Sequence, residues 1–294
     1  MKLIEKSIKP EKAKAWHYKV HPYFTKQSHN VVKAYVENFT KKGDVVLDPF
    51  SGSGVTGLVA LELGRKAFLS DLNPFAVFIG KQTAKLSKVD LVTFGNEYVK
   101  IEENIKESVK FIRTSSEKEI EDYKITEWYP TDIKMPSNSD FKNFKELFDK
   151  RQLIVLAKLY QLILEIQDED IQGVLKLIFS TTLNATNKTF MKNTKGSGGG
   201  ASSVMKLYRY YRAKNHKYLD VFEIFEARMK IMKRAIDKVQ GLNFNLDDFQ
   251  IYHTSATNLD YLENQSIDYI YTDPPYGKKI TYLDLSTIFN AWLN

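Results

Sequence analysis

The chain has 294 residues, 43% of them hydrophobic, and this length allows one large domain or two smaller ones that each bury a core. The absence of cysteine excludes a disulfide framework and a thiolate zinc site, and without a signal peptide or an 18-residue apolar run we expect a soluble, cytoplasmic protein with no membrane contact. The net charge of +7 favours a polyanionic partner.

Residues 44–71 have the pattern of a β-α-β unit. The run 44–48 (DVVLD) predicts a strand that ends in an acid, and the turn SGSG follows it. Residues 55–63 predict a helix that Gly64 ends, and residues 66–71 (KAFLSD) predict a second strand. Two strands joined by a helix imply a parallel sheet with a right-handed crossover. An α/β, doubly wound fold is therefore expected.

A large insertion follows, because residues 145–167, 170–191 and 221–239 have long helical patterns. Between them, KNTKGSGGGASS (residues 192–203) is a Gly/Ser tract with the composition of a mobile loop. Strand patterns return at 249–253 (FQIYH) and 267–272 (IDYIYT), and a helical pattern occupies 283–293. We expect three parts, namely residues 1–88, a mostly helical insertion over 89–245, and a return to the sheet over 246–294.

The glycine-rich turn is compatible with two cofactors. Gly52, Gly54 and Gly57 match GxGxxG, and Asp71 lies 19 residues after the first glycine, which is the spacing of a dinucleotide fingerprint. A nicotinamide dehydrogenase is thus one alternative. Asp48, at the predicted strand end, would repel a diphosphate and attract the ammonium of a methionine moiety, which favours a methionine-containing cofactor. A turn whose glycines serve geometry alone is the structural alternative.

Residues 21–56 (HPYFTKQSHNVVKAYVENFTKKGDVVLDPFSGSGVT) resemble the junction of motifs X and I in amino-methylating DNA methyltransferases. The match departs at Lys26–Gln27, where the family often has Lys-Pro. The resemblance implies a Rossmann-like class I methyltransferase sheet and S-adenosyl-L-methionine as cofactor, held by the backbone of the loop and by Asp71 on the ribose hydroxyls. Asp71 also suits that role because a carboxylate can accept two hydroxyls. The expected cofactor site consists of Thr25, Asp48, Pro49, Phe50, Ser51, Gly52, Gly54, Thr56, Asp71, Leu72, Asn73, Ser255 and Ala256.

Asp273-Pro274-Pro275-Tyr276 follows the last predicted strand and resembles motif IV of the same family. The prolines fix the backbone, so that the Pro274 carbonyl and the Asp273 carboxylate can each accept one hydrogen of an amino group. Tyr276 offers a ring on which a flipped-out base can stack. In the family an acid at the first position accompanies adenine, so the resemblance implies N6 of adenine, with N4 of cytosine as the alternative. At residues 254–257 relatives often place an acid that contacts the adenine amino group of the cofactor, so we expect Ser255 to give weaker affinity for that adenine without changing the reaction class.

The positive charge is concentrated in one segment, since residues 171–219 contain nine cations and no acid, whereas the rest of the chain has 34 basic and 36 acidic residues. Within it, MKLYRYYRAKNHKY combines cations with Tyr208, Tyr210, Tyr211 and Tyr218, a mixture that suits phosphate contacts and base stacking. A solvated basic face is the alternative. We expect DNA contacts at Lys206, Arg209, Arg212, Lys214 and Lys217 within the insertion. The histidines lack the carboxylates of a metal site, and none is expected.

Only four strands are predicted, whereas the family's sheet has seven in the order 3-2-1-4-5-7-6. We therefore expect a fragment, or one subunit of a split enzyme whose second polypeptide supplies the remaining strands. The predicted function is an S-adenosylmethionine-dependent DNA (adenine-N6) methyltransferase of a restriction-modification system that flips its target base, inactive as the isolated chain. The non-enzyme alternative is a fragment that binds cofactor or DNA without turnover.

Overall fold

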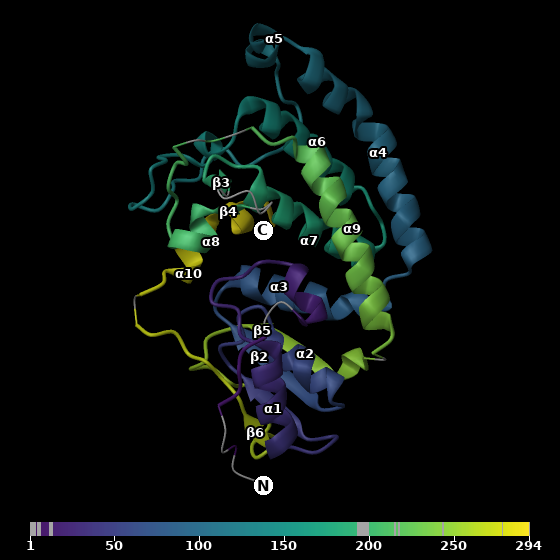
Figure 1. The fold of residues 1–294 in the computed structure, drawn as a ribbon, viewed down its shortest axis with the longest axis vertical. Helices are drawn as coiled ribbons and strands as arrows, with labels where there is room; N and C mark the ends of the chain where they lie inside the picture. Colours follow the sequence, from purple (N-terminus) through teal and green to yellow (C-terminus); the bar gives the residue numbers. More distant parts are fainter. Residues whose placement is uncertain are drawn as a thin grey trace. The chain divides into compact units, whose positions relative to one another are not determined.

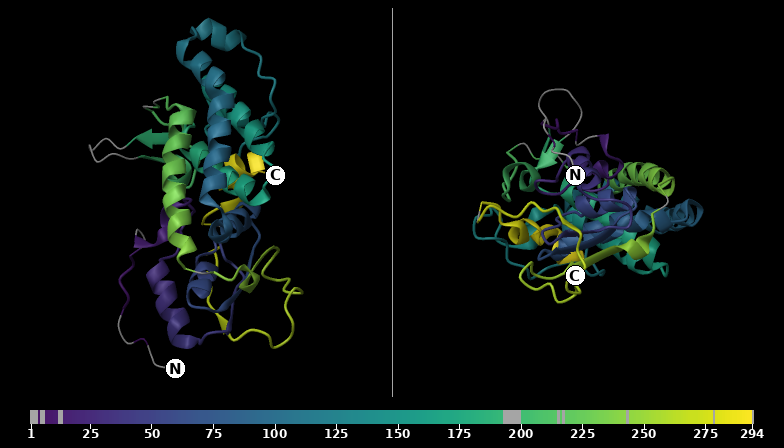
Figure 2. Two further views of the ribbon diagram at one scale, coloured as in Figure 1. Left: turned by 90° about the vertical axis from the view of Figure 1, so that its right-hand side faces the viewer. Right: turned by 90° about the horizontal axis from the view of Figure 1, so that it is seen from below.

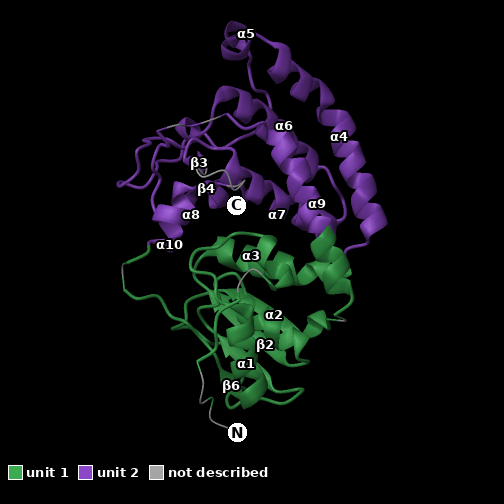
Figure 3. Ribbon diagram, viewed as in Figure 1, with its two compact units in different colours: residues 1–88, 234–280 green, residues 89–233, 281–294 purple. Residues whose placement is uncertain are grey.

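The computed structural model of the chain (Figure 1) describes residues 4, 7–11, 14–192, 200–214, 216, 218–242, 244–277 and 279–293. Most of the Gly/Ser tract and the candidate DNA contact Lys217 lie outside the described residues. The chain forms two compact units (Figure 3), unit 1 with residues 1–88 and 234–280, and unit 2 with residues 89–233 and 281–294. Residues 281–294, which the sequence analysis grouped with the sheet, belong to unit 2.

Unit 1 contains a parallel sheet of four strands, β1 (Val45–Asp48), β2 (Lys66–Asp71), β5 (Phe249–His253) and β6 (Tyr269–Ile270). Its order is β5-β2-β1-β6, which confirms the predicted Rossmann-like sheet. Numbered by their sequence within this sheet, the strands lie in the order 3-2-1-4. β6 is shorter than predicted, and its pairing ends at Tyr271, whose amide donates to the Leu47 carbonyl at 3.1 Å. The carboxyl ends of all four strands therefore share one edge.

Three helices cover this sheet, α1 (His29–Phe39), α2 (Val55–Glu62) and α3 (Pro74–Lys85). Residues 55–61 of α2 are buried on every side, because α2 packs between α1 and strands β1 and β2. A Cβ at Gly57 would lie 2.5 Å from the Leu69 side chain, so only glycine permits this approach to the sheet. α3 begins at a proline in its first turn, and the preceding Asn73 caps it by accepting a hydrogen bond from the Phe75 amide at 3.2 Å.

Unit 2 is mostly helical, as predicted for the insertion. Its helices are α4 (Leu91–Thr114), α5 (Glu117–Asp122), α6 (Lys150–Leu164), α7 (Glu169–Ala185), α8 (Ser203–Leu207), the first part of α9 (Val221–Gln240), α10 (Tyr282–Leu285) and α11 (Thr287–Leu293). α6 starts five residues after the predicted position because Asp149 and Gln152 form a capping box there. α7 ends early because Asn187 bonds both the Leu183 carbonyl and the Thr189 amide.

Two features of unit 2 were not predicted. Strands β3 (Phe190–Lys192) and β4 (Gly200–Ser202) form an antiparallel pair on either side of the glycine tract. The Tyr210 hydroxyl donates to the Leu285 carbonyl at 2.7 Å and accepts from the Ile288 amide at 3.1 Å, which fixes α10 and α11 in this unit. The fully buried Trp292 adds ring contacts with Tyr160 and Phe179, and Figure 2 shows these last helices in yellow among teal helices of the unit. No helix in the described parts of the chain is long and apolar enough to cross a bilayer.

Candidate active site

Asp48, the last residue of β1, connects three segments of unit 1. Its Oδ2 accepts a hydrogen bond from the Thr56 hydroxyl at the start of α2, at 2.6 Å. Its Oδ1 accepts from the Phe50 amide at 3.1 Å and from the Thr272 hydroxyl at 2.8 Å. Thr272 directly precedes the Asp-Pro-Pro-Tyr loop, so one carboxylate holds the glycine-rich loop and the base of the candidate catalytic loop together.

The surroundings of Asp48 change the role that the sequence suggested for it. The side chain is only 1% exposed, and burial raises the pKa of Asp48 to about 6, against the three hydrogen bonds that lower it. A buried carboxylate with three hydrogen bonds stabilises the glycine-rich loop from within the protein. The direct attraction of a ligand ammonium that we expected is therefore not the interaction that this geometry provides.

Asp71, at the end of β2, holds the other side of the loop. Its Oδ2 accepts from the Gly52 amide and its Oδ1 from the Asn73 amide, both at 2.8 Å. Burial raises the pKa of Asp71, although both hydrogen bonds oppose that shift. Each carboxylate oxygen can accept a second hydrogen bond, so Asp71 retains the capacity to bind two vicinal hydroxyls.

Tyr23 is a site residue that the sequence analysis missed. A Cβ on Gly52 would lie 3.1 Å from the Tyr23 ring, and the Tyr23 hydroxyl accepts a hydrogen bond from the Asn73 side chain at 3.3 Å. Gly52 has a φ of +51°, which glycine adopts without strain, and the ring occupies the space above it. Thr25, which we predicted instead, is exposed and has a φ of +50°, an unusual conformation for a β-branched residue.

The remaining candidate cofactor residues lie on the loops that follow β1, β2 and β5. Pro49, Phe50, Ser51 and Gly54 form the loop after β1, in which the Ser51 carbonyl accepts from the Gly54 amide at 2.9 Å. Leu72, 59% exposed, follows β2 and leaves an apolar side chain at the surface. Ser255 and Ala256 follow β5, but the Ser255 hydroxyl is bonded to Thr257 at 2.9 Å. A contact from Ser255 to a ligand would have to replace or share that bond.

The Asp-Pro-Pro-Tyr loop itself is exposed from Asp273 to Gly277. Tyr276 is 79% exposed, and its hydroxyl makes a long hydrogen bond of 3.4 Å to Asp273 Oδ1. Gly277, with a φ of +59°, ends the loop. The Asp273 carboxylate is thus accessible to an incoming amino group, while the loop is anchored one residue earlier through Thr272.

The candidate DNA contacts Lys206, Arg209, Arg212 and Lys214 all lie in unit 2, and the structure corrects two expectations about their segment. Tyr210 is buried in the core and cannot stack on a base, and Tyr218 is half-buried, so Tyr208 and Tyr211 are the exposed rings. The segment is free of acids only in sequence, because carboxylates from elsewhere pair with it in space. These ion pairs are Arg209 with Asp140 at 3.4 Å and Lys188 with Asp149 at 3.2 Å.

Comparison with known proteins agrees with this geometry. Residues 4–86, which include the glycine-rich loop, Tyr23 and Asp71, match the family described as DNA methylase. In this region the chain is similar to amino-methylating DNA methylases. It is 25% identical to the Type II methyltransferase M.MjaII of Methanocaldococcus jannaschii over 321 aligned residues, which cover 90% of this chain and 59% of that protein. The chain thus spans 59% of the length of this DNA methylase relative.

A second relative shares a shorter region. The ribosomal protein L11 methyltransferase of Lachnospira eligens is 35% identical over 65 residues, which is 22% of this chain and 20% of that protein. No solved structure matches the chain. Among the residues that the structure describes, no three histidine or acidic side chains gather as ligands for a metal ion.

Proposed function

We propose that the protein is an S-adenosylmethionine-dependent DNA methyltransferase that modifies an exocyclic amino group, and that its target is N6 of adenine. The observation that carries the proposal is the hydrogen bond from Thr272 to Asp48, because it ties the Asp-Pro-Pro-Tyr loop to the glycine-rich loop at neighbouring strand ends. The family match and the name of the relative M.MjaII, a Type II methyltransferase, support this proposal and a restriction-modification context.

The residues at the strand ends fit the cofactor. Asp71 keeps acceptor capacity for ribose hydroxyls, Gly52 and Gly54 turn the loop through left-handed conformations, and Phe50 and Leu72 expose apolar surface for the adenine ring. When bound, the cofactor supplies a methyl group activated by its sulfonium. The same glycine-rich loop could hold a dinucleotide. A nicotinamide enzyme, however, has no use for the pair of amino-hydrogen acceptors that the adjacent Asp-Pro-Pro-Tyr loop presents.

The catalytic loop supplies the other half of the chemistry. In the proposed mechanism the target base leaves the helix and stacks on Tyr276, because its amino group cannot be reached within the duplex. The Asp273 carboxylate and the Pro274 carbonyl accept the two amino hydrogens, which orients the nitrogen lone pair away from them. Asp273 is exposed, and its hydrogen bond to the Tyr276 hydroxyl is long, so its carboxylate is accessible for this role.

Cytosine N4 is the second candidate target. It also presents an amino group with two hydrogens, and the family includes enzymes for both bases. The acid at position 273 favours adenine through the motif resemblance. That the substrate is DNA is also part of the proposal. The second relative is a methyltransferase of a ribosomal protein, so similarity to methyltransferases does not by itself specify DNA as the substrate.

The test is methyl transfer from labelled S-adenosylmethionine by the full-length protein to DNA of mixed sequence, followed by mass spectrometry of the released nucleosides. We expect N6-methyladenine from the wild type and none from Asp273→Ala, with Asp260→Ala as the matched control because Asp260 is an exposed aspartate of the same unit. N4-methylcytosine would favour the second candidate. Label on protein instead of DNA, or cofactor binding without transfer, would overturn the proposed activity.

A further inference from the structure

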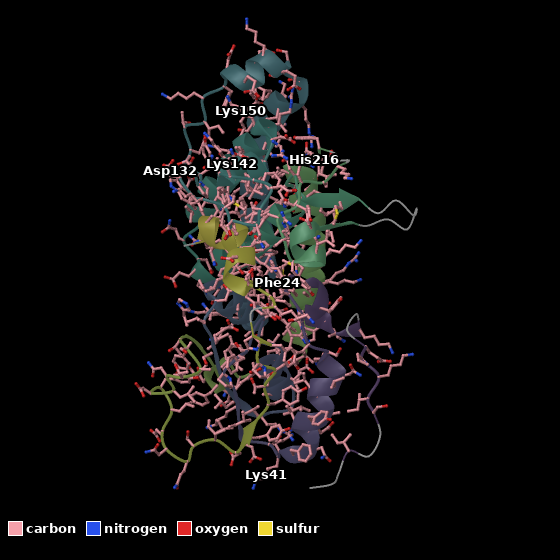
Figure 4. The ribbon with its side chains drawn as sticks, turned by 90° about the vertical axis from the view of Figure 1, so that its left-hand side faces the viewer. Phe24, Lys41, Asp132, Lys142, Lys150 and His216 are labelled. Carbon is pink, nitrogen blue, oxygen red and sulfur yellow. The ribbon has the colours of Figure 1, made fainter. Side chains whose placement is uncertain are left out.

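In unit 2 a single carboxylate, Asp140, organises two arginines of the acid-free segment. Asp140 Oδ1 lies 3.4 Å from the Arg209 guanidinium, and Oδ2 accepts from the Arg212 backbone amide at 3.0 Å. The Asp140 amide donates in turn to the Tyr210 carbonyl at 3.0 Å. The turn around Asp140 and the segment 209–212 are therefore held together as one surface element. Figure 4 labels Lys142, two residues from Asp140, in this unit.

Both guanidinium groups are also stacked on aromatic rings. The Arg209 guanidinium carbon lies 4.4 Å from the centroid of the Tyr211 ring, and that of Arg212 lies 4.4 Å from the centroid of Phe141. Arg209 further donates to the Tyr211 hydroxyl at 3.3 Å. Stacking restricts both side chains, and the ion pair with Asp140 restricts Arg209 further, so less conformational entropy is lost when their remaining donors bind a ligand.

The nature of that ligand follows from the charges. A phosphate would be repelled by the carboxylate of Asp140 and by Glu146, which interacts electrostatically with Arg212. The edge of a base is neutral, and a guanidinium that is stacked on a ring can donate two parallel hydrogen bonds to O6 and N7 of guanine. Lys206 and Lys214 are exposed, and in the described parts of the chain no acid pairs with either one, which suits phosphate contacts.

We propose that Arg209 and Arg212 recognise guanine edges in the DNA target, while Lys206 and Lys214 contact the phosphate backbone. This inference rests on the proposed function for its DNA substrate and adds the residues that determine sequence preference. It divides the candidate DNA contacts into a pair that specifies sequence and a pair that supplies affinity.

The experiment selects bound sequences from random duplex DNA with the full-length protein, in parallel for the wild type, Arg209→Lys, Arg212→Lys and Asp140→Asn. The lysine variants keep the charge but lose the planar fork, and we expect each to relax the preference for guanine at one position by about 5- to 150-fold. Lys206→Gln and Lys214→Gln should keep the preference, lower the affinity for all sequences and reduce the slope of log affinity against log salt by about 0.9 each.

Arg113→Lys is the matched control, because Arg113 also pairs with a carboxylate in unit 2, at 2.8 Å from Asp220. Arg212→Lys keeps the test independent of folding, since Arg212 bonds Asp140 through its backbone. A uniform loss of affinity with unchanged preference in the arginine variants, or no selective binding by the wild type, would overturn the inference. Selective binding without methyl transfer would overturn the proposed function and leave this inference standing.

Discussion

The two loops that meet at Asp48 differ in how far they are fixed. The glycine-rich loop is hydrogen-bonded to the carboxylates of Asp48 and Asp71, and the Tyr23 ring packs against it at Gly52. The Asp-Pro-Pro-Tyr loop is bonded at its base through Thr272 and exposed over the rest of its length. Under the proposed function, the first loop would hold the cofactor in a fixed geometry, and the second would keep its functional groups accessible for the target base. Four predictions test this difference, and we order them from the largest expected effect to the smallest.

Asp273→Ala should lower the rate of methyl transfer by roughly 10²- to 10⁴-fold, because the amino group loses its charged acceptor. The free energy of unfolding should change by less than about 0.5 kcal/mol, since the side chain is exposed. Steady-state kinetics and urea unfolding measure the two quantities separately. A large decrease in the free energy of unfolding of Asp273→Ala would show that the Asp273 side chain stabilises the fold, as Asp48 and Asp71 do at the glycine-rich loop.

Asp48→Asn should remove a pH dependence of stability. Because the pKa of Asp48 in the folded chain is about 6 against a usual value of 3.8, the folded state holds this proton more tightly than the unfolded state. Its contribution is fully present below about pH 4 and is lost as the pH rises through 6, a decrease of about 3 kcal/mol. Urea unfolding of both proteins from pH 4 to 7 tests this, and parallel curves would contradict it.

Gly52→Ala should destabilise unit 1 by about 1–3 kcal/mol, because alanine at a φ of +51° is strained and its methyl group would meet the Tyr23 ring at 3.1 Å. Gly277→Ala is the comparison in the other loop, with a φ of +59° and, among the described residues other than its chain neighbours, no atom within 4 Å of the added carbon. The difference between the two melting temperatures isolates the contact with Tyr23. Equal decreases in melting temperature would show that the Tyr23 ring moves aside without a measurable loss of stability.

Tyr276→Phe should have the smallest effect, because it keeps the ring and removes only the long hydrogen bond to Asp273. Tyr276→Ala removes the stacking surface as well and should weaken DNA binding by about 1–3 kcal/mol. The KM for DNA of the two variants distinguishes stacking from hydrogen bonding. If Tyr276→Phe weakened DNA binding as much as Tyr276→Ala, the hydroxyl group and not the ring would be the part of Tyr276 that contributes to binding.

Much of unit 1 could be predicted from local sequence. The bounds of β2 and β5 agree with the strand patterns, and the sheet order is as expected, because buried parallel strands have short apolar runs between turn signals. The hydrogen bond from Thr272 to Asp48 could not be predicted, since the two residues are remote in sequence. The same holds for Tyr23 above Gly52, because nothing in the spacing shows which aromatic residue covers the loop.

Unit 2 was predicted less well, for a related reason. The acid-free stretch suggested an unopposed basic surface, but Asp140 comes from a turn far earlier in the chain. The pattern of residues 283–293 predicted one helix, whereas the structure has two short helices, α10 and α11, and places them in unit 2, where the buried hydroxyl of Tyr210 bonds to both. Charge and helical period can be counted along a sequence, whereas partners that meet only after folding cannot.

The adjacency of β2 and β5 in the sheet has a consequence for how such a protein can vary. All of unit 2 except residues 281–294 is inserted between these two paired strands, yet Ala67 to Asp71 pair with Phe249 to His253 without interruption. The entropy of closing a flexible connection rises by only about 0.6 kcal/mol for each doubling of its length, and an insert that folds by itself costs less still. The connection between these strands is therefore a place where inserts of different size can be accommodated while the strand ends keep their geometry.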